Sequence, residues 1–211
     1  MQSRINYQLE TDRILAQLPE DHVPALFLHS SSYVLEYLSQ YFNITLFFYN
    51  PNISPESEYL HRKAELKRLV QELPLGHPVR IVDGDYVPER FYALAKGLED
   101  LPERGLRCQK CIGHRLEETF RIALQQPERP DYVCTTLTIS PHKDAVFINT
   151  KGTELAQQYG IAWLPTDFKK KGGYQRSIVL SREYDLYRQN FCGCVYSRLE
   201  AERREKEMAS S

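Results

Sequence analysis

Short apolar runs alternate with longer amphipathic stretches along the first 160 residues of the chain. The short apolar runs predict buried strands, and apolar positions spaced three or four apart predict helices. We expect strands at residues 24–30, 44–50, 78–86 and 131–139. We expect helices at 7–18, 32–42, 88–100 and 111–126, and a last one within 140–160. A long helix is expected within 50–73, with Ser54 as its cap and Pro55 in its first turn.

This alternation of strand and helix is typical of an α/β domain whose parallel sheet carries helices on both faces. In such sheets, ligands bind beyond the carboxyl ends of the strands. The loops that follow Ser30, Asn50 and Leu137 are therefore the expected rim of a site.

The pattern changes after Gly160, where apolar runs become scarce and Lys, Arg, Tyr and Gly become frequent. We interpret 1–160 as the α/β domain, 161–197 as a functional segment that closes the site, and 198–211 as a charged, solvated helical tail. The three parts are expected to form one compact domain.

The composition narrows the class of protein. An apolar content of 42% and a charged content of 26% are ordinary for a globular chain, and the net charge of −1 excludes only a strong global attraction to nucleic acid. No apolar run is long enough to span a membrane, and the first residues lack the apolar block of a secretory signal. We therefore expect a cytoplasmic protein, in which close cysteine pairs are more often metal ligands or redox centres than structural disulfides.

Four of the five cysteines form two close pairs. Cys108 and Cys111 have C-x-x-C spacing, and Cys111 opens a predicted helix, whose N-terminus would stabilise a thiolate. Cys192 and Cys194 flank one glycine, which suits either a strained, easily reduced disulfide or two thiolates on one metal. Cys134 lies in an apolar run and is expected in the core. Four thiolates suit a tetrahedral zinc site or a four-iron cluster, and both remain open at this point.

Long motifs of this chain resemble those of the QueH-type epoxyqueuosine reductases. These motifs are "FFYNPNISPESEYLHR", "GLEDLPERGLRCQKCIGHRLEETFRIA", "TTLTISPHKD" and "LPTDFKKKGGYQRSIVLSREYDLYRQNFCGC". The resemblance implies a HUP-like α/β fold and the last step of queuosine synthesis, in which an epoxide in the tRNA anticodon loop is reduced to an alkene. It also implies a 4Fe-4S cluster and an additional iron, no cobalamin, and an electron donor that the sequence does not identify.

The resemblance also implies roles for individual residues. Cys108 and Cys111 match the cluster ligands of the family, and Cys192 and Cys194 match its C-G-C pair, which we interpret as redox-active. Asp167 is a candidate partner for iron or for a proton, although an aspartate there is equally typical of a turn or a helix cap. The candidate tRNA contacts are Lys143, Lys169, Lys170, Lys171, Arg176, Tyr187 and Arg188.

One stretch departs from the family. The family has an adjacent cysteine pair and a third cysteine after its first strand, whereas this chain has "FLHSSSYVLEYL", without the remaining cluster ligands. We predict that the native protein carries a cysteine-rich turn between Ser30 and Ser31, and an intact mass equal to that of the printed sequence would contradict this. The alternative of a phosphate-binding turn at "HSSS" is disfavoured because it lacks the glycines that let backbone approach phosphate.

Two other classes of function stay open on the residues alone. The four paired cysteines could form one structural zinc site in an RNA-binding module without catalysis, or they could serve a thiol oxidoreductase that acts on proteins. A brown, iron-containing protein would favour the reductase, and a colourless protein with one equivalent of zinc would favour the module.

Overall fold

The computed structural model describes residues 5–29 and 34–209, and it has an α/β fold around a five-stranded parallel sheet. The strand order is β3-β2-β1-β4-β5, with β1 in the centre. The strands are β1 (Ala25–His29), β2 (Asn43–Phe48), β3 (Val79–Asp83), β4 (Tyr132–Thr135) and β5 (Ala162–Trp163). The predicted fold class is confirmed. The predicted cysteine-rich turn after Ser30, within "HSSS", lies outside the described residues.

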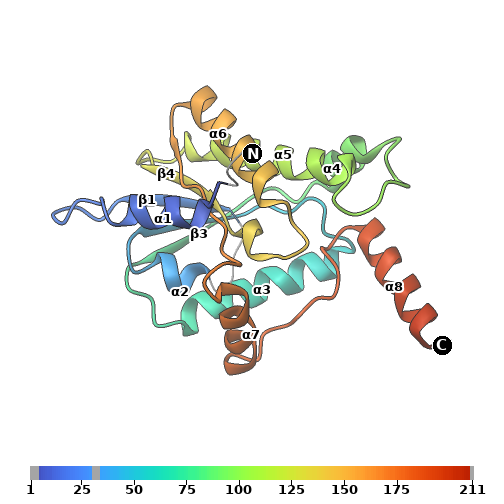
Figure 1. Cartoon of the computed structure of the whole chain (residues 1–211). Coiled ribbons are helices and arrows are strands. Elements are labelled where there is room, and N and C mark those ends of the chain that lie inside the picture. The colour runs from blue at the N-terminus through green and yellow to red at the C-terminus, as the bar shows by residue number, and fades with distance from the viewer. Residues whose placement is uncertain (1–4, 30–33, 210–211) are drawn as a thin grey trace.

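Helices cover both faces of the sheet, as Figure 1 shows. The helices of the described residues are α1 (Tyr7–Leu15), α2 (Val34–Leu38), α3 (Glu56–Glu72), α4 (Pro88–Ala95), α5 (Leu106–Ala123), α6 (Ala145–Tyr159), α7 (Gly173–Glu183) and α8 (Val195–Ala209). In Figure 1, α2, α3 and α7 lie below the sheet, and α5 and α6 lie above it.

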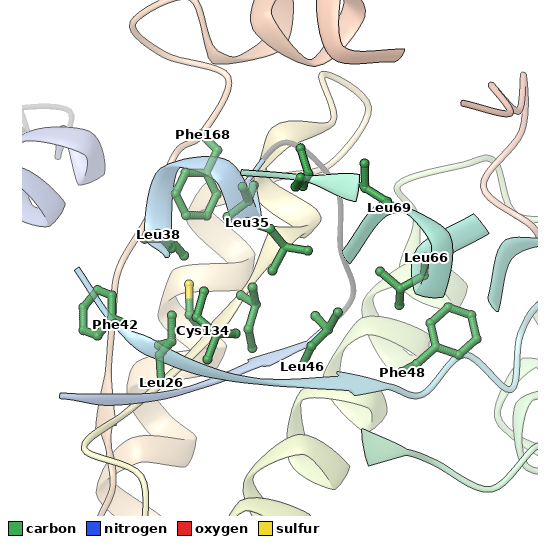
Figure 2. Packing of buried hydrophobic residues seen from close by; sticks show 14 of the residues in the cluster. Leu26, Leu35, Leu38, Phe42, Leu46, Phe48, Leu66, Leu69, Cys134 and Phe168 are labelled. Carbon is green, nitrogen blue, oxygen red and sulfur yellow. The ribbon is translucent and has the colours of Figure 1, made fainter. Parts of the chain in front are cut away.

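Alternate residues of the strands supply two separate cores, because successive side chains of a strand point to opposite faces. Leu26 and Leu46 face α2 and α3, and Figure 2 shows them packed toward Leu35 and Leu38 with Cys134 in the same cluster. Phe27 and its neighbours on the other face pack with α5 and α6. Cys134 is fully buried, which confirms the expectation that it is a core residue.

The second half of the predicted strand at 131–139 is not a strand. Residues Thr136–Ile139 form a 3-10 turn, because the Thr135 side chain accepts a hydrogen bond from the backbone N–H of Leu137 and turns the chain. The sheet therefore ends at Thr135, and the residues beyond it are free to line a site.

The cap of α3 also differs from the prediction. Pro55, not Ser54, precedes the first helical residue, and no side chain caps this end. The backbone N–H of Ser54 instead donates to the carbonyl oxygen of Gly193 at 2.9 Å. This contact brings the second cysteine pair to the start of α3.

The segment 161–197 contributes to the core before it reaches the site. Ala162 and Trp163 pair with β4 as the edge strand β5, and Leu164 and Phe168 are buried. The tail is the charged helix predicted from the sequence: α8 is exposed from residue 202 to 208 and extends away from the body in Figure 1. Within the described residues, no helix is long and apolar enough to cross a membrane.

Candidate active site

A cavity of about 500 Å³ lies beyond the carboxyl ends of β2 and β4. Asn50 and Asn52 follow β2 on one side, and Thr136 and Leu137 follow β4 on another. The loops after Asn50 and Leu137 thus form the rim expected from the sequence. A cavity of this volume is in the range that holds a nucleotide-sized ligand.

The first cysteine pair reaches the cavity from α5. Cys108 and Cys111 are the third and sixth residues of this helix, so both lie on one face, and both are half-buried cavity residues. Burial raises the pKa of Cys111 to about 11, against the opposing effect of the Arg115 charge, and burial also raises the pKa of Cys108. As isolated groups, both are therefore thiols at neutral pH.

This finding corrects the sequence prediction that Cys111 opens a helix and is held as a thiolate by the helix N-terminus. The helix starts earlier, at Leu106, because Arg107 anchors its first turn. The guanidinium of Arg107 is buried, lies 4.6 Å from the ring centroid of Tyr196, and donates to the carbonyl oxygens of Leu98, Glu99 and Leu101. Cys111 is thereby placed in the second turn, where the dipole of the helix end has little effect.

The second pair lies in the residues that link α7 to α8. Cys192 is half-buried and Cys194 is 4% exposed, and their Sγ atoms are 3.6 Å apart, so they are two thiols and not a disulfide. The hydrogen bond with Cys194 holds the pKa of Cys192 well below its usual range, helped by Lys143 and Ser197. The same hydrogen bond raises the pKa of Cys194. The pair therefore holds one thiolate and one thiol.

We call residues 186–194 the cysteine strap. The strap lies against α3 through polar contacts: Arg62 Nη1 donates to the carbonyl oxygen of Cys192 at 3.2 Å, and the backbone N–H of Tyr187 donates to Glu65 Oε2 at 3.1 Å. Gly193 has a φ of +115°, a conformation that favours glycine. The strap thus carries the second pair to the cavity that Cys108 and Cys111 already line.

Lys143 is half-buried and lies close enough to Cys192 and Cys108 to interact with both charges. It lines the cavity, its Nζ lies 3.1 Å from Glu103 Oε1, and its side chain is 12% exposed. Burial alone would lower the pKa of Lys143, but the charges of Cys192 and Glu103 outweigh burial, and the pKa is raised. Lys143 is therefore a cation that faces the cysteines.

Tyr187 and Arg188 also line the cavity, on the strap. Tyr187 is 41% exposed, its ring meets His61 edge-on with centroids 4.6 Å apart, and its hydroxyl donates to Glu58 Oε2 at 3.3 Å. The ring is thus fixed in place while much of its surface faces solvent.

The basic residues Lys169, Lys170, Lys171 and Arg176, which we call the basic loop, lie outside the cavity lining. Lys169 pairs with Asp167 at 2.7 Å, and Lys171 pairs with Asp12. Arg176 pairs with Glu36 and lies 3.6 Å from Glu183. Among the described residues that line the cavity, none belongs to the set Asp167, Lys169, Lys170, Lys171 and Arg176. The structure therefore brings together the four paired cysteines and Lys143, Tyr187 and Arg188, and leaves the basic loop outside.

Sequence reasoning missed several polar residues of the site. Arg115 is only 6% exposed, lines the cavity and donates to the Oδ1 atom of Asn50, which is also buried. The spacing held a signal, because Arg115 follows Cys111 by four residues and so shares its helix face. Arg62 and Ser197 carried no comparable signal, since their roles depend on how distant segments pack.

The thiols can be compared with the ligand set that the implied iron–sulfur cluster needs. Thiolates are the ligands such clusters require, and two pairs of cysteines reach one cavity. Within residues 5–29 and 34–209, however, no group of three or more His, Cys, Asp or Glu side chains is arranged to hold a metal ion. The described residues therefore do not assemble a complete ligand set, and Cys108 and Cys111 would be only a part of one.

Comparisons with known proteins identify the family of this chain. The family model "Epoxyqueuosine reductase QueH" matches residues 29–200. An epoxyqueuosine reductase QueH of Streptococcus pyogenes serotype M1 is 39% identical over 204 residues, which cover 91% of this chain and 79% of the relative. The protein of the same name from Staphylococcus epidermidis is 39% identical over 204 residues, covering 92% and 85% of the two chains. That of Thermotoga maritima is 39% identical over 163 residues, covering 76% and 81%. The match spans both cysteine pairs and the strap between α7 and α8, and the chain belongs to the QueH family of epoxyqueuosine reductases.

Proposed function

We propose that this chain reduces the epoxide of epoxyqueuosine in the tRNA anticodon loop to the alkene of queuosine, the last step of queuosine synthesis. The observation that carries the proposal is the convergence of two cysteine pairs, from α5 and from the strap, on one cavity beyond the carboxyl ends of the strands. Membership of an oxidoreductase family supports the same conclusion.

The electron count fits a dithiol. Converting an epoxide to an alkene removes the oxygen as water and consumes two electrons and two protons. Oxidation of Cys192 and Cys194 to a disulfide supplies both, because a dithiol gives up two electrons and two protons as its S–S bond forms. The two sulfurs are adjacent, and one of them is held as a thiolate, the form that attacks. A reductant outside the chain must then restore the dithiol.

Iron is part of the proposal, through Cys108 and Cys111. A 4Fe-4S cluster passes electrons one at a time, and an additional iron with an open position can polarise an oxygen. The described residues do not assemble a complete ligand set for the cluster, and the two electrons of the reduction come from the dithiol of Cys192 and Cys194. No cobalamin is required, and the reaction belongs in the cytoplasm with its tRNA.

The substrate would be held at two places. Tyr187 and Arg188 at the cavity can stack on a nucleotide that is turned out of the anticodon loop, and Lys143 adds a cation inside. Phosphates of the tRNA farther from the cavity would be contacted by Lys169, Lys170, Lys171 and Arg176. Lys169, Lys171 and Arg176 would first have to release the carboxylates with which they pair in the free protein. Neutralising these four should flatten the salt dependence of tRNA binding by about one unit of slope per lost phosphate contact. An unaltered slope would leave them as surface charge.

The test is an assay on tRNA that contains epoxyqueuosine, with nucleoside products measured by mass spectrometry. Cys192→Ser and Cys194→Ser should each stop turnover and leave most of the bound iron, whereas Cys134→Ser, in the core, should keep both. Loss of iron in both strap variants would make these cysteines ligands. A colourless wild type with one zinc and no turnover would favour the zinc-stabilised RNA-binding module, and activity on a generic disulfide would favour a thiol oxidoreductase acting on proteins.

A further inference from the structure

Arg115 places a buried positive charge at the wall of the cavity. The residue is 6% exposed and lines the cavity. Its Nη2 donates to Oδ1 of Asn50, which is a neutral amide, and its Nε is buried without a hydrogen-bond partner. No Asp or Glu side chain of the described chain forms an ion pair with Arg115. A charge that is taken out of water without a counter-ion costs free energy, so a ligand that brings negative charge would be bound favourably there.

The other cations at the cavity differ from Arg115, because each of them has partners or faces solvent. They are Arg62, Arg107, Lys143, Arg188 and Arg204. Arg62 and Lys143 pair with carboxylates, with N–O distances of 2.8 and 3.1 Å. Arg107 donates to three backbone carbonyl oxygens, and the remaining two arginines are exposed. Among the described cavity residues, Arg115 alone is buried with a single hydrogen bond to offset its charge.

The charge of Arg115 acts close to the thiols. Arg115 follows Cys111 by four residues in α5, so the two side chains share one face of the helix. Cys111 and Cys192 pack against the apolar cluster that contains Cys194. Burial raises the pKa of Cys111, and the Arg115 charge is the strongest influence that opposes this rise. A substrate that reacts with the strap pair would therefore have its reacting atoms in the field of Arg115.

We propose that Arg115 stabilises the negative charge on the oxygen that is released when the epoxide opens. This role rests on the proposed function. One thiolate of the strap pair bonds to an epoxide carbon as the C–O bond breaks, and the oxygen becomes an alkoxide. The alkoxide takes up from solvent the equivalent of the proton that this thiol had released. The second thiol then attacks the bound sulfur, the S–S bond forms and the C–S bond breaks. The released electron pair forms the C=C bond, and the oxygen leaves as water with the proton of the second thiol.

An arginine without a carboxylate partner suits this task. The guanidinium keeps its proton throughout, so it acts through its charge and its N–H donors and does not serve as an acid. Such a group is most effective when it is fixed before the reaction, in a site from which water is excluded. The amide of Asn50 holds Arg115 without cancelling its charge, whereas a carboxylate at that place would cancel it. Asn50 is therefore the positioning residue and Arg115 the catalytic one.

Asn50→Asp tests this role with little change of shape. Aspartate can accept the same hydrogen bond from Arg115, but it neutralises the guanidinium. We expect kcat on saturating epoxyqueuosine tRNA to fall by about a hundredfold, the effect of losing one group that stabilises a developing oxyanion. Tm should stay the same or rise, because the new ion pair offsets a buried charge. If Arg115 served the fold alone, the variant would be as active as the wild type.

Arg115→Ala gives a second measurement, by chemical rescue. We expect kcat to fall by at least about a hundredfold, and guanidinium chloride at millimolar concentration to restore it by about tenfold. Sodium chloride at the same concentration should not restore it. The matched control is Arg121→Ala, on the same helix but exposed and outside the cavity lining, which should keep the kcat of the wild type. If Arg115→Ala does not fold, Asn50→Asp decides the question.

An unchanged kcat in a folded Asn50→Asp variant would overturn the role of Arg115. Loss of kcat in Arg115→Ala would not save it in that case, because the loss would then come from the fold. The proposed function fails in a different way. A wild type without turnover on epoxyqueuosine tRNA refutes the reductase and this role with it, whereas turnover in the wild type and equal turnover in Asn50→Asp refute the role of Arg115 alone.

Discussion

Gly193→Ala tests whether the strap must lie closely against α3. The new β-carbon would stand 2.9 Å from Ile53 Cγ1 and 3.1 Å from Arg62 Nη1, and the residue would keep a φ of +115°. The backbone conformation costs a non-glycine residue about 1–2 kcal/mol. If the strap moves away to relieve the contact with Ile53, the hydrogen bond from Ser54 to the Gly193 carbonyl is lost, which adds about 1 kcal/mol.

The sum is a destabilisation of about 2–3 kcal/mol, which lowers Tm by about 4–12 °C for a chain of this size. The matched control is Gly172→Ala, because Gly172 has a φ of +76° and a β-carbon added there would have no neighbouring atom within 4 Å. That change has only the backbone cost, about 1 kcal/mol or about 2–4 °C.

Thermal melting followed by circular dichroism measures both variants, and turnover on epoxyqueuosine tRNA measures the effect on the pair. We expect Gly193→Ala to lose most turnover, because Cys192 moves with the strap, and Gly172→Ala to keep it. Equal Tm values and equal turnover in the two variants would refute the inference that the contact with α3 positions the cysteines.

Three further predictions concern other parts of the chain. Replacing Cys108 and Cys111 together with serine should abolish bound iron, measured by metal analysis, and unchanged iron content would contradict their role as ligands. Burial holds the pKa of His29 well below its usual value, so below about pH 6.5 the unfolded chain takes up a proton that the folded chain does not. Stability in urea should therefore fall as the pH drops through that range, by up to about 1.4 kcal/mol per pH unit, and a flat profile would contradict this. Gly152→Ala would place a β-carbon 2.2 Å from Trp163 Cε2 and should cost about 3 kcal/mol, seen as a lower Tm; an unchanged Tm would contradict the close packing of α6 on β5.

The central sheet was predictable because parallel strands that are buried on both faces appear in the sequence as continuous apolar runs. β1 and β2 coincide with such runs within a residue or two at each end. β5 was not predicted, because two residues carry no periodicity. The strand predicted at 131–139 was too long, since its apolar residues continue past Thr135, where a side-chain hydrogen bond turns the chain.

The site was predictable in its thiols and in Lys143, Tyr187 and Arg188, which also line the cavity. The spacing and chemistry of Cys108, Cys111, Cys192 and Cys194 mark them in the sequence, and the structure places all four at one cavity. The partners of Lys171 and Arg176 could not be predicted, because Asp12 and Glu36 come from α1 and α2, far away in the sequence. The helix start at Leu106 depends likewise on carbonyl groups that only the folded chain brings to Arg107.

The helix that projects from the body in Figure 1 begins immediately after Cys194, so a change in backbone direction at the pair would be carried along the helix to its far end. Its 15 residues span about 22 Å, so a tilt of the whole helix by about 10° would move the far end by about 4 Å. A displacement of a few ångströms is readily measured between two spectroscopic labels. A probe near Met208, which is 80% exposed, could therefore follow small changes in direction at the cysteine pair from a position well outside the cavity.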